Sequence, residues 1–248
     1  TGVQTCALPI SYYCENRDPD FDQKMHNVLL VYKQLSLQFD ENGQLLPFPE
    51  DEQATHVLSY DEKPGIQAIA NTTEDLPPDE NHKTISRDYE YKRLGTISLL
   101  AGIDLQTGEA IPLVRDRHSS KEYIEFLQLL DSKYPKEDKI RLVLDNLQVH
   151  TSQETRKYLA GVPGRFEFVF TPKHGSWLNL VEGFFSKLTR QSLKGIRVKT
   201  KSELVERIYK YFEEINDTPV VYHWKYRLNE INPNEEAQVE TLSFEKSS

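Results

Sequence analysis

Hydrophobic and polar positions along the chain predict a group of strands followed by alternating helices and strands. Short apolar runs between polar or Pro/Gly-containing segments are typical of strands, and apolar residues recurring every three or four positions are typical of helices. Strands are expected at residues 56–60, within 94–114 as two strands around a turn at Gln106–Gly108, at 139–145 and at 166–170. Helices are expected at residues 20–32, from about 119 to 130, and at 152–160, 176–193 and 202–215. This order predicts an α/β fold in which a mixed sheet is flanked by helices.

The same pattern divides the chain into a central domain with an arm at each end. Residues 53–215 contain the expected sheet, residues 11–52 precede it with one helix, and residues 216–248 form a C-terminal arm with an acidic tail. Thr1–Ile10 has no helical or strand period, and it resembles the translation of a sequencing-adapter read. We expect it to be an assembly artefact, the alternative being an ordinary disordered N-terminus.

Composition narrows the class of protein. A chain of 248 residues with 38 % hydrophobic residues suits one large globular domain. No apolar run is long enough to span a membrane. The two cysteines, Cys6 and Cys14, argue against a disulfide framework and a cysteine zinc site. With no signal-peptide pattern at its start, the chain is expected in the cytoplasm, with no membrane partner.

Charge neither supports nor excludes a nucleic-acid partner. The formal net charge is −9, whereas residues 172–210 carry nine Lys/Arg against three Asp/Glu. A basic stretch of this kind suits DNA, but it suits a solvated helix face equally well. An acidic total is also compatible with a nuclease, because a metal-dependent active site needs an acidic pocket.

Three carboxylates stand out by their positions in the predicted elements. Asp61 and Asp145 are each the first charged residue after an apolar strand, where functional groups collect in α/β sheets. Either residue taken alone is more typical of a turn or a helix cap. Glu182 lies at the border of an apolar helix stripe and should point toward the sheet edge; the alternative is a surface pair with Lys187 or Arg190.

Carboxylates that converge in this way require cations. Hard oxygen ligands suit Mg²⁺ or Mn²⁺, and two such ions support in-line displacement at phosphorus. Gly183 beside Glu182 costs about 1 kcal/mol relative to Ala inside a helix, which is reasonable where another backbone or a ligand comes close. Zinc is not expected, because no thiolate or motif spacing accompanies His118, His150 and His174.

Three segments together resemble one protein family. DEKPGIQA (61–68), RLVLDNLQVHTS (141–152) and TPKHGSWLNLVEGFFSKLTR (171–190) are similar to the Asp-Asp-Glu (DDE) transposases of the Tc/mariner superfamily, specifically its bacterial insertion-sequence branch. The resemblance covers nearly all of residues 11–227, and the order and spacing of the blocks make it specific. It implies a ribonuclease H-like fold.

The resemblance also implies chemistry and partners. Asp61, Asp145 and Glu182 would be the three catalytic acids, holding two Mg²⁺ or Mn²⁺ ions for DNA strand cleavage and strand transfer. The partners would be transposon ends and target DNA with insertion at TA dinucleotides, bound by a homodimer or larger assembly in a bacterial, nucleoid-associated setting. Family members carry helix-turn-helix modules before this domain, so residues 11–52 are expected to be a linker helix and the remnant of a missing DNA-binding region.

Neighbouring residues are candidates for supporting roles. Asn146 and His150 are expected to orient Asp145. Candidate DNA contacts are Lys63, Lys173, Trp177, Lys187 and Arg190. Taken singly, the four cations are more typical of a solvated surface, and Trp177 is at least as typical of ordinary packing. Trp177 could stack on an unpaired base, and residues 223–227 (HWKYR) suit a DNA or subunit contact as well as a docked terminus.

Two alternatives to a transposase stay open at the level of sequence. A resolvase-like nuclease would use the same fold and the same acids. A catalytically silent, truncated DNA-binding remnant would keep the fold without the activity.

Overall fold

A computed structural model describes residues 18–47 and 53–242 of the chain, so Thr1–Ile10 lies outside the described residues. The strands are β1 (Thr55–Asn71), β2 (Tyr91–Asp104), β3 (Ala110–Arg115), β4 (Lys139–Leu144) and β5 (Phe166–Phe170). The α-helices are α1 (Phe21–Ser36), α2 (Ser120–Lys133), α3 (Gln153–Leu159), α4 (Leu180–Leu188) and α5 (Lys201–Asn216). The strand order is β3-β2-β1-β4-β5, antiparallel from β3 to β1 and parallel from β1 to β5, which confirms the predicted mixed sheet.

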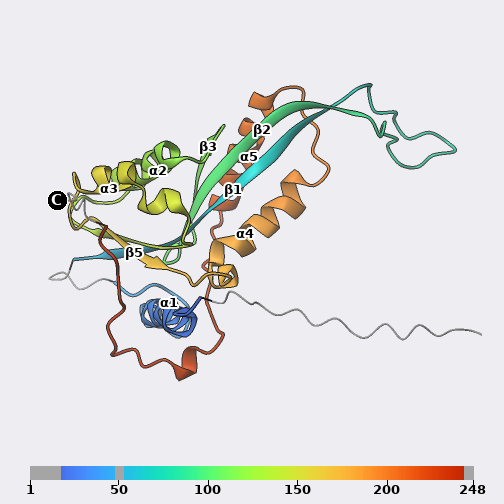
Figure 1. Ribbon diagram of the computed structural model, residues 1–248. Coiled ribbons are helices and arrows are strands. Elements are labelled where there is room, and N and C mark those ends of the chain that lie inside the picture. The colour runs from blue at the N-terminus through green and yellow to red at the C-terminus, as the bar shows by residue number, and fades with distance from the viewer. Residues whose placement is uncertain (1–17, 48–52, 243–248) are drawn as a thin grey trace, which may run out of the picture.

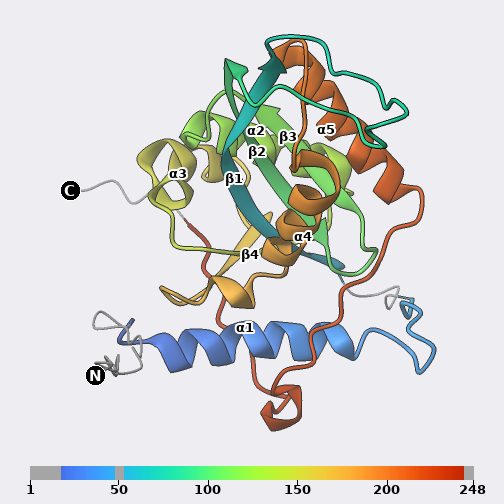
Figure 2. The ribbon, with the colours of Figure 1, turned by 90° about the vertical axis from the view of Figure 1, so that its right-hand side faces the viewer.

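Helices cover both faces of this sheet. One apolar core joins the sheet to α1, α4 and α5, and a second joins it to α2 and α3. Alternate residues of β1 serve the two cores: Val57 belongs to the first, and Leu58 and Tyr60 belong to the second. Figure 2 shows α4 in front of β1, with α2 behind the sheet. The two faces of β1 therefore meet different surroundings.

The first strand is longer than its apolar pattern indicates. The sequence predicts a strand that ends at Asp61, whereas β1 continues to Asn71 and pairs with β2 as far as Tyr91. The register shifts between Lys63 and Ile66, where Gly65 has a φ of 68°. The prediction was wrong because charged residues, Pro64 and Gly65 interrupt the apolar run after Tyr60. Ile66 and Ala68 beyond them are buried in the first core, and the strand then continues as an arm, visible in Figure 1. Asp61 consequently lies within a strand rather than at its end.

The helix predicted for residues 176–193 is divided into three parts. A 3₁₀ turn at Ser176–Leu178 precedes α4, and a π-helical turn at Thr189–Leu193 follows it. The first break occurs because Asn179 adopts an extended backbone (φ −89°, ψ 109°). Asn179, rather than the expected Ser176, is therefore the residue at the start of α4.

The two ends of the described chain pack together beneath the sheet, as Figure 1 shows. The side chain of Asn27 on α1 donates to the backbone oxygen of Gln238 at 2.6 Å, and His26 pairs with Glu235 at 2.8 Å. Further along, Glu240 forms an antiparallel bridge with Phe168 of β5. Among the described residues, no helix combines the length and hydrophobicity needed to cross a membrane.

Candidate active site

The parallel register of β1 and β4 brings two of the predicted acids together. Ser59 pairs with Val143, and two residues further along the chain stand Asp61, within β1, and Asp145, the first residue after β4. Residues two apart lie on the same face of a strand. Asp61 therefore lies on the face of Ser59, which contacts the start of α4.

A buried polar network fixes the start of α4 against this part of β1. The Ser59 hydroxyl accepts the backbone N–H of Val181 at 2.9 Å and donates to the side-chain oxygen of Asn179. The Asn179 amide in turn donates to the backbone oxygen of Tyr60 at 2.8 Å. All three hydrogen bonds form within two residues of Asp61, so the first turn of α4, which carries Glu182, is held close to that carboxylate.

An open cavity of about 500 Å³ collects acidic and basic side chains at this place. Its lining includes Asp61, Glu62, Lys63, Pro64, Glu182, Phe185, Ser186, Thr189 and Arg190. Glu182 is exposed and Asp61 is half-buried. The side chain of Asp145 is 43 % exposed, so solutes can reach it as well.

Burial raises the pKa of Asp61 to about 7. The backbone N–H of Glu62 opposes this shift, and the carboxylates of Glu62, Asp145 and Glu182 add to it. Like charges disfavour full ionisation of a cluster, but here removal from water is the larger cause. A cation in the cavity would reverse both effects by favouring the charged carboxylate.

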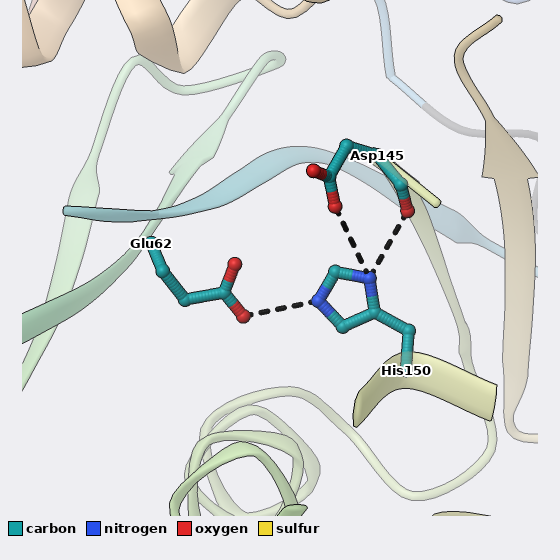
Figure 3. Close-up of side chains that lie close together, drawn as sticks. All are labelled: Glu62, Asp145 and His150. Atoms are coloured by element: carbon teal, nitrogen blue, oxygen red, sulfur yellow. Dashed lines mark hydrogen bonds and ion pairs between the residues drawn. The ribbon is translucent and has the colours of Figure 1, made fainter. Parts of the chain in front are cut away.

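A second group of side chains, which includes Asp145 itself, gathers around the ring of His150 (Figure 3). Within the described residues, the only three-residue set of histidine or carboxylate groups with ligand atoms within 4.8 Å of one another is Glu62, Asp145 and His150. Nε2 of His150 lies 3.0 Å from Glu62, and its Nδ1 lies 3.0 Å from the backbone oxygen of Asp145 and 3.4 Å from the Asp145 carboxylate. Asp61 and Glu182 are not members of this set.

This second group has the properties of a support for Asp145 rather than those of an open metal site. The side chain of His150 is fully buried and that of Glu62 is 4 % exposed. Burial lowers the pKa of His150, but the hydrogen bond and charge of Glu62 and the carbonyl of Asp145 make the net shift upward. Both ring nitrogens are thus engaged by acceptors, and the hydroxyl of Tyr60 donates to Glu62 at 2.8 Å.

Sequence reasoning missed Glu62 because its neighbour Asp61 is the first charged residue after the apolar run and was selected instead. The signal that could have found it is the two-residue period of β1, which turns Glu62 to the face of the buried Tyr60. Asn146, which was expected to orient Asp145, donates its side-chain amide to the backbone oxygen of Thr171. It therefore ties the end of β4 to the residue that follows β5.

The other predicted residues are distributed over several places. Lys63 and Arg190 line the cavity with Asp61, whereas Lys187 lines a separate cavity with Val220 and Tyr222. Lys173 and Trp177 are exposed in the segment between β5 and α4. A Cβ at Gly183 would meet no described atom within 4 Å, so the expected close approach of another backbone is wrong, and the position opens to solvent.

A five-stranded mixed sheet in the order 3-2-1-4-5, with acids on β1, directly after the adjoining β4 and on helix α4, defines a ribonuclease H-like domain with an acidic site. Residues 57–205 match the model of the DDE superfamily endonuclease family. The chain belongs to this family, and the predicted resemblance and fold class are confirmed.

Individual relatives agree with this membership. The chain is 25 % identical over 206 residues to the insertion element IS630 uncharacterized 39 kDa protein of Shigella sonnei, covering 82 % of this chain and 53 % of that protein. It thus spans about half the length of this relative. The fold matches the catalytic domain of Mos1 mariner transposase (TM-score 0.51, 13 % identity, 83 % of this chain and 85 % of that chain). It also matches the Mos1 mariner paired end complex with Mn (TM-score 0.53, 11 % identity, 85 % and 60 %).

Proposed function

We propose that this protein is the catalytic domain of a DNA transposase that cleaves DNA strands and joins them to a target. The observation that carries the proposal is the placement of Asp61, Asp145 and Glu182. Two of these acids extend a pair of adjoining parallel strands, and the third lies in the helix turn fixed against the same strand. Membership of the DDE superfamily endonucleases supports their assignment as the three catalytic acids.

The residues fit a pair of Mg²⁺ or Mn²⁺ ions. Carboxylate oxygens are the donors that these cations prefer, and the raised pKa of Asp61 identifies a carboxylate that a cation would stabilise. Asp61, Asp145 and Glu182 would hold the ions, which when bound supply activation of the attacking oxygen and neutralisation of the leaving oxygen. The solved Mos1 complex with Mn supports this choice of metal.

The protein's own residues would hold the DNA around these acids. Lys63 and Arg190 line the same cavity as Asp61 and Glu182, where their charges suit the phosphates beside the reacting one. His150, bonded to Glu62 and to the Asp145 carbonyl, would keep Asp145 in position while the substrate changes.

A basic trough leads away from this cavity along the arm formed by β1 and β2. The catalytic cavity shares Lys63 and Pro64 with a cavity of about 270 Å³, which shares residues 195–197 with one of about 920 Å³. The cations along these two cavities are Lys63, Arg87, Lys92, Lys194, Arg197, Lys199 and Arg207. Arg87 and Arg207 form ion pairs with Asp75 and Glu203 of the same lining, and the other five cations outnumber the remaining acid, Glu74. Nε of Arg197 is buried without a hydrogen-bond partner among the described residues. The trough suits the backbone of a bound DNA strand.

The partners follow from this function and from the relatives. Transposon ends and target DNA are the proposed ligands, in keeping with the Mos1 strand transfer complex, which has the same fold (TM-score 0.53, 13 % identity, 92 % of this chain and 63 % of that chain). A homodimer or larger assembly is proposed, because an element with two ends needs two active sites. Action on DNA in the bacterial cytoplasm is part of the same proposal.

The decisive test replaces one acid while keeping its shape. Asp145→Asn should abolish Mn²⁺-dependent nicking of plasmid DNA, because it removes a charge that holds metal. DNA affinity at fixed salt should stay the same or rise, because phosphate contacts by Lys and Arg persist and one negative charge is lost. Glu206→Gln on the exposed face of α5 is the matched control and should cleave like the parent.

The outcome also separates the two alternatives. Undiminished cleavage by Asp145→Asn would refute the metal assignment. Release of 3′-hydroxyl ends that are then joined to a second DNA favours a transposase, whereas cleavage without joining favours a resolvase-like nuclease. A parent protein that binds DNA and never cleaves it would be a silent remnant.

A further inference from the structure

Three aromatic side chains form an exposed surface beside the candidate active site. The rings of Trp177 and Trp224 lie 6.0 Å apart at an interplanar angle of 30°, and Tyr226 meets Trp177 edge-on at 5.8 Å. Trp177 is 47 % exposed and Tyr226 is 56 % exposed. We call Trp177, Trp224 and Tyr226 the aromatic shelf. Large apolar side chains that stay this accessible while packing on one another mark an interaction site.

Packing against α1 and backbone hydrogen bonds hold the shelf in place. Buried Tyr32 of α1 stacks on Trp224 with 5.4 Å between ring centroids, and its hydroxyl donates to the backbone oxygen of Leu178 at 2.7 Å. The indole N–H of Trp224 donates to the backbone oxygen of Tyr226 at 2.8 Å. Three separate segments therefore fix the rings before any ligand binds, which reduces the entropy lost on binding.

The position of the shelf relates it to the catalytic acids. Trp177 belongs to the segment that links β5 to α4, and Glu182 follows five residues later. At the beginning of that segment, the N–H of Thr171 donates to the oxygen of Leu144, the residue before Asp145. Trp177 thus lies just before α4, and residues of α4 and of the turn that follows it line the cavity with Asp61.

Basic residues adjoin the shelf in sequence. Lys173, His174 and Lys225 are exposed beside the aromatic residues in sequence. Neither lysine forms an ion pair within residues 18–47 and 53–242, whereas Arg227 is paired with Glu230 at 2.6 Å. Flat aromatic faces combined with unpaired lysines are the combination by which proteins bind single-stranded nucleic acids.

We propose that the aromatic shelf binds an unpaired base of the DNA strand that passes through the active site. A base within a duplex is covered on both faces by its neighbours, so only an unstacked base can offer its face to Trp177. Lys173 and Lys225 would neutralise the adjoining phosphates. The proposal rests on the proposed DNA-cleaving function for the identity of its ligand, and it adds that the enzyme holds a strand with at least one base unpaired.

The chain provides its own reporter for this binding. Its two tryptophans, Trp177 and Trp224, are both members of the shelf, so all tryptophan fluorescence originates there. Titration with a single-stranded thymidine 12-mer in EDTA should quench this fluorescence, and a duplex of equal length at the same salt should quench it much less. Because EDTA prevents metal-dependent cleavage, the measurement reports binding alone.

Variants distinguish stacking from other causes. Trp177→Ala should weaken single-strand binding roughly tenfold, measured by anisotropy of a labelled 12-mer, and Trp177→Phe should restore most of the affinity. Tyr226→Ala should also weaken binding. Tyr89→Ala is the matched control, since Tyr89 is 86 % exposed in the distant loop between β1 and β2, and its removal should change nothing.

Three results would overturn the proposal. One is unchanged single-strand affinity in Trp177→Ala, and another is equal quenching by single strand and duplex. The third is shielding of the tryptophans from acrylamide in protein without DNA that increases with protein concentration, which would mean that a second copy covers the shelf. If the parent nicks DNA but shows no quenching, the shelf assignment fails and the proposed function stands. If single-stranded DNA quenches the fluorescence but the parent does not nick DNA, the shelf assignment stands and the proposed function fails.

Discussion

Glu62 and His150 form a buried ion pair, with 3.0 Å between Oε1 and Nε2, on the face of β1 opposite the side chain of Asp61. Adjacent residues of one strand thus serve two layers of the site. Asp61 faces the substrate cavity, and Glu62 holds the histidine that contacts Asp145. The alternation of side chains along a strand makes this division possible.

Breaking this pair should destabilise the protein strongly. Glu62→Ala leaves the buried His150 without its charged partner, and removal of one member of a buried pair costs roughly 3–5 kcal/mol of unfolding free energy. Urea denaturation would measure the loss. Glu214→Ala is the matched control, because Glu214 and Lys210 are exposed and 4.0 Å apart, and its effect should stay below about 1 kcal/mol. A loss of similar size in both variants would contradict the assigned role of Glu62.

Removing the charge of Asp61 should stabilise the metal-free protein. The folded state raises its pKa from 3.8 to about 7, so the folded protein binds the proton more tightly than the unfolded chain does. The contribution of Asp61 to stability is therefore greatest at low pH and declines as pH rises from about 4 to about 7. Asp61→Asn removes this decline.

Thermal unfolding in EDTA at several pH values would test this. The melting temperature of Asp61→Asn should exceed that of the parent by a margin that grows between about pH 4 and pH 7 and then stays constant. The margin at pH 8 should be several degrees, since about 1 kcal/mol corresponds to roughly 2–4 °C in a domain of this size. A variant less stable than the parent at pH 8 would show that Asp61 carries no such penalty.

Ser59 should matter for both stability and cleavage. Ser59→Ala leaves the N–H of Val181 and the oxygen of Asn179 without their partner in a buried place, at a cost of about 1–3 kcal/mol. Because these bonds set the position of Glu182, cleavage should fall roughly tenfold to a hundredfold even where the variant remains folded. The single-turnover nicking rate, measured below the melting temperature, would show this loss of cleavage. Ser202→Ala, at an exposed serine, is the control. Full cleavage activity in a destabilised Ser59→Ala variant would mean that Ser59 contributes to folding alone.

Much of this site follows from elementary patterns in the sequence. Apolar runs that end beside Asp61 and Asp145 indicate two strands of one sheet, and their parallel register then brings the acids together. The distal half of β1 could not be predicted in this way, because residues 61–65 interrupt the apolar run and pairing with β2 carries the strand past them to Asn71. The break before α4 depends on Ser59, which is 120 residues distant from Asn179 in sequence. Contacts of this kind leave no local pattern.

Metal binding should depend on pH through Asp61. A divalent ion and a proton compete for this carboxylate, so Mn²⁺ should raise the melting temperature little at pH 5.5 and increasingly up to about pH 8. At a hundred times its dissociation constant, a bound ligand adds about 2.7 kcal/mol to the free energy of unfolding, which raises the melting temperature of this domain by roughly 5–10 °C.

Calorimetry in buffers of different ionisation heat should detect protons released on metal binding near pH 6.5. Asp61→Asn should lose the effect, and Asp79→Asn, in the exposed loop between β1 and β2, should keep it. A shift of equal size at pH 5.5 and pH 8, or one that persists in Asp61→Asn, would place the bound metal elsewhere on this acidic protein.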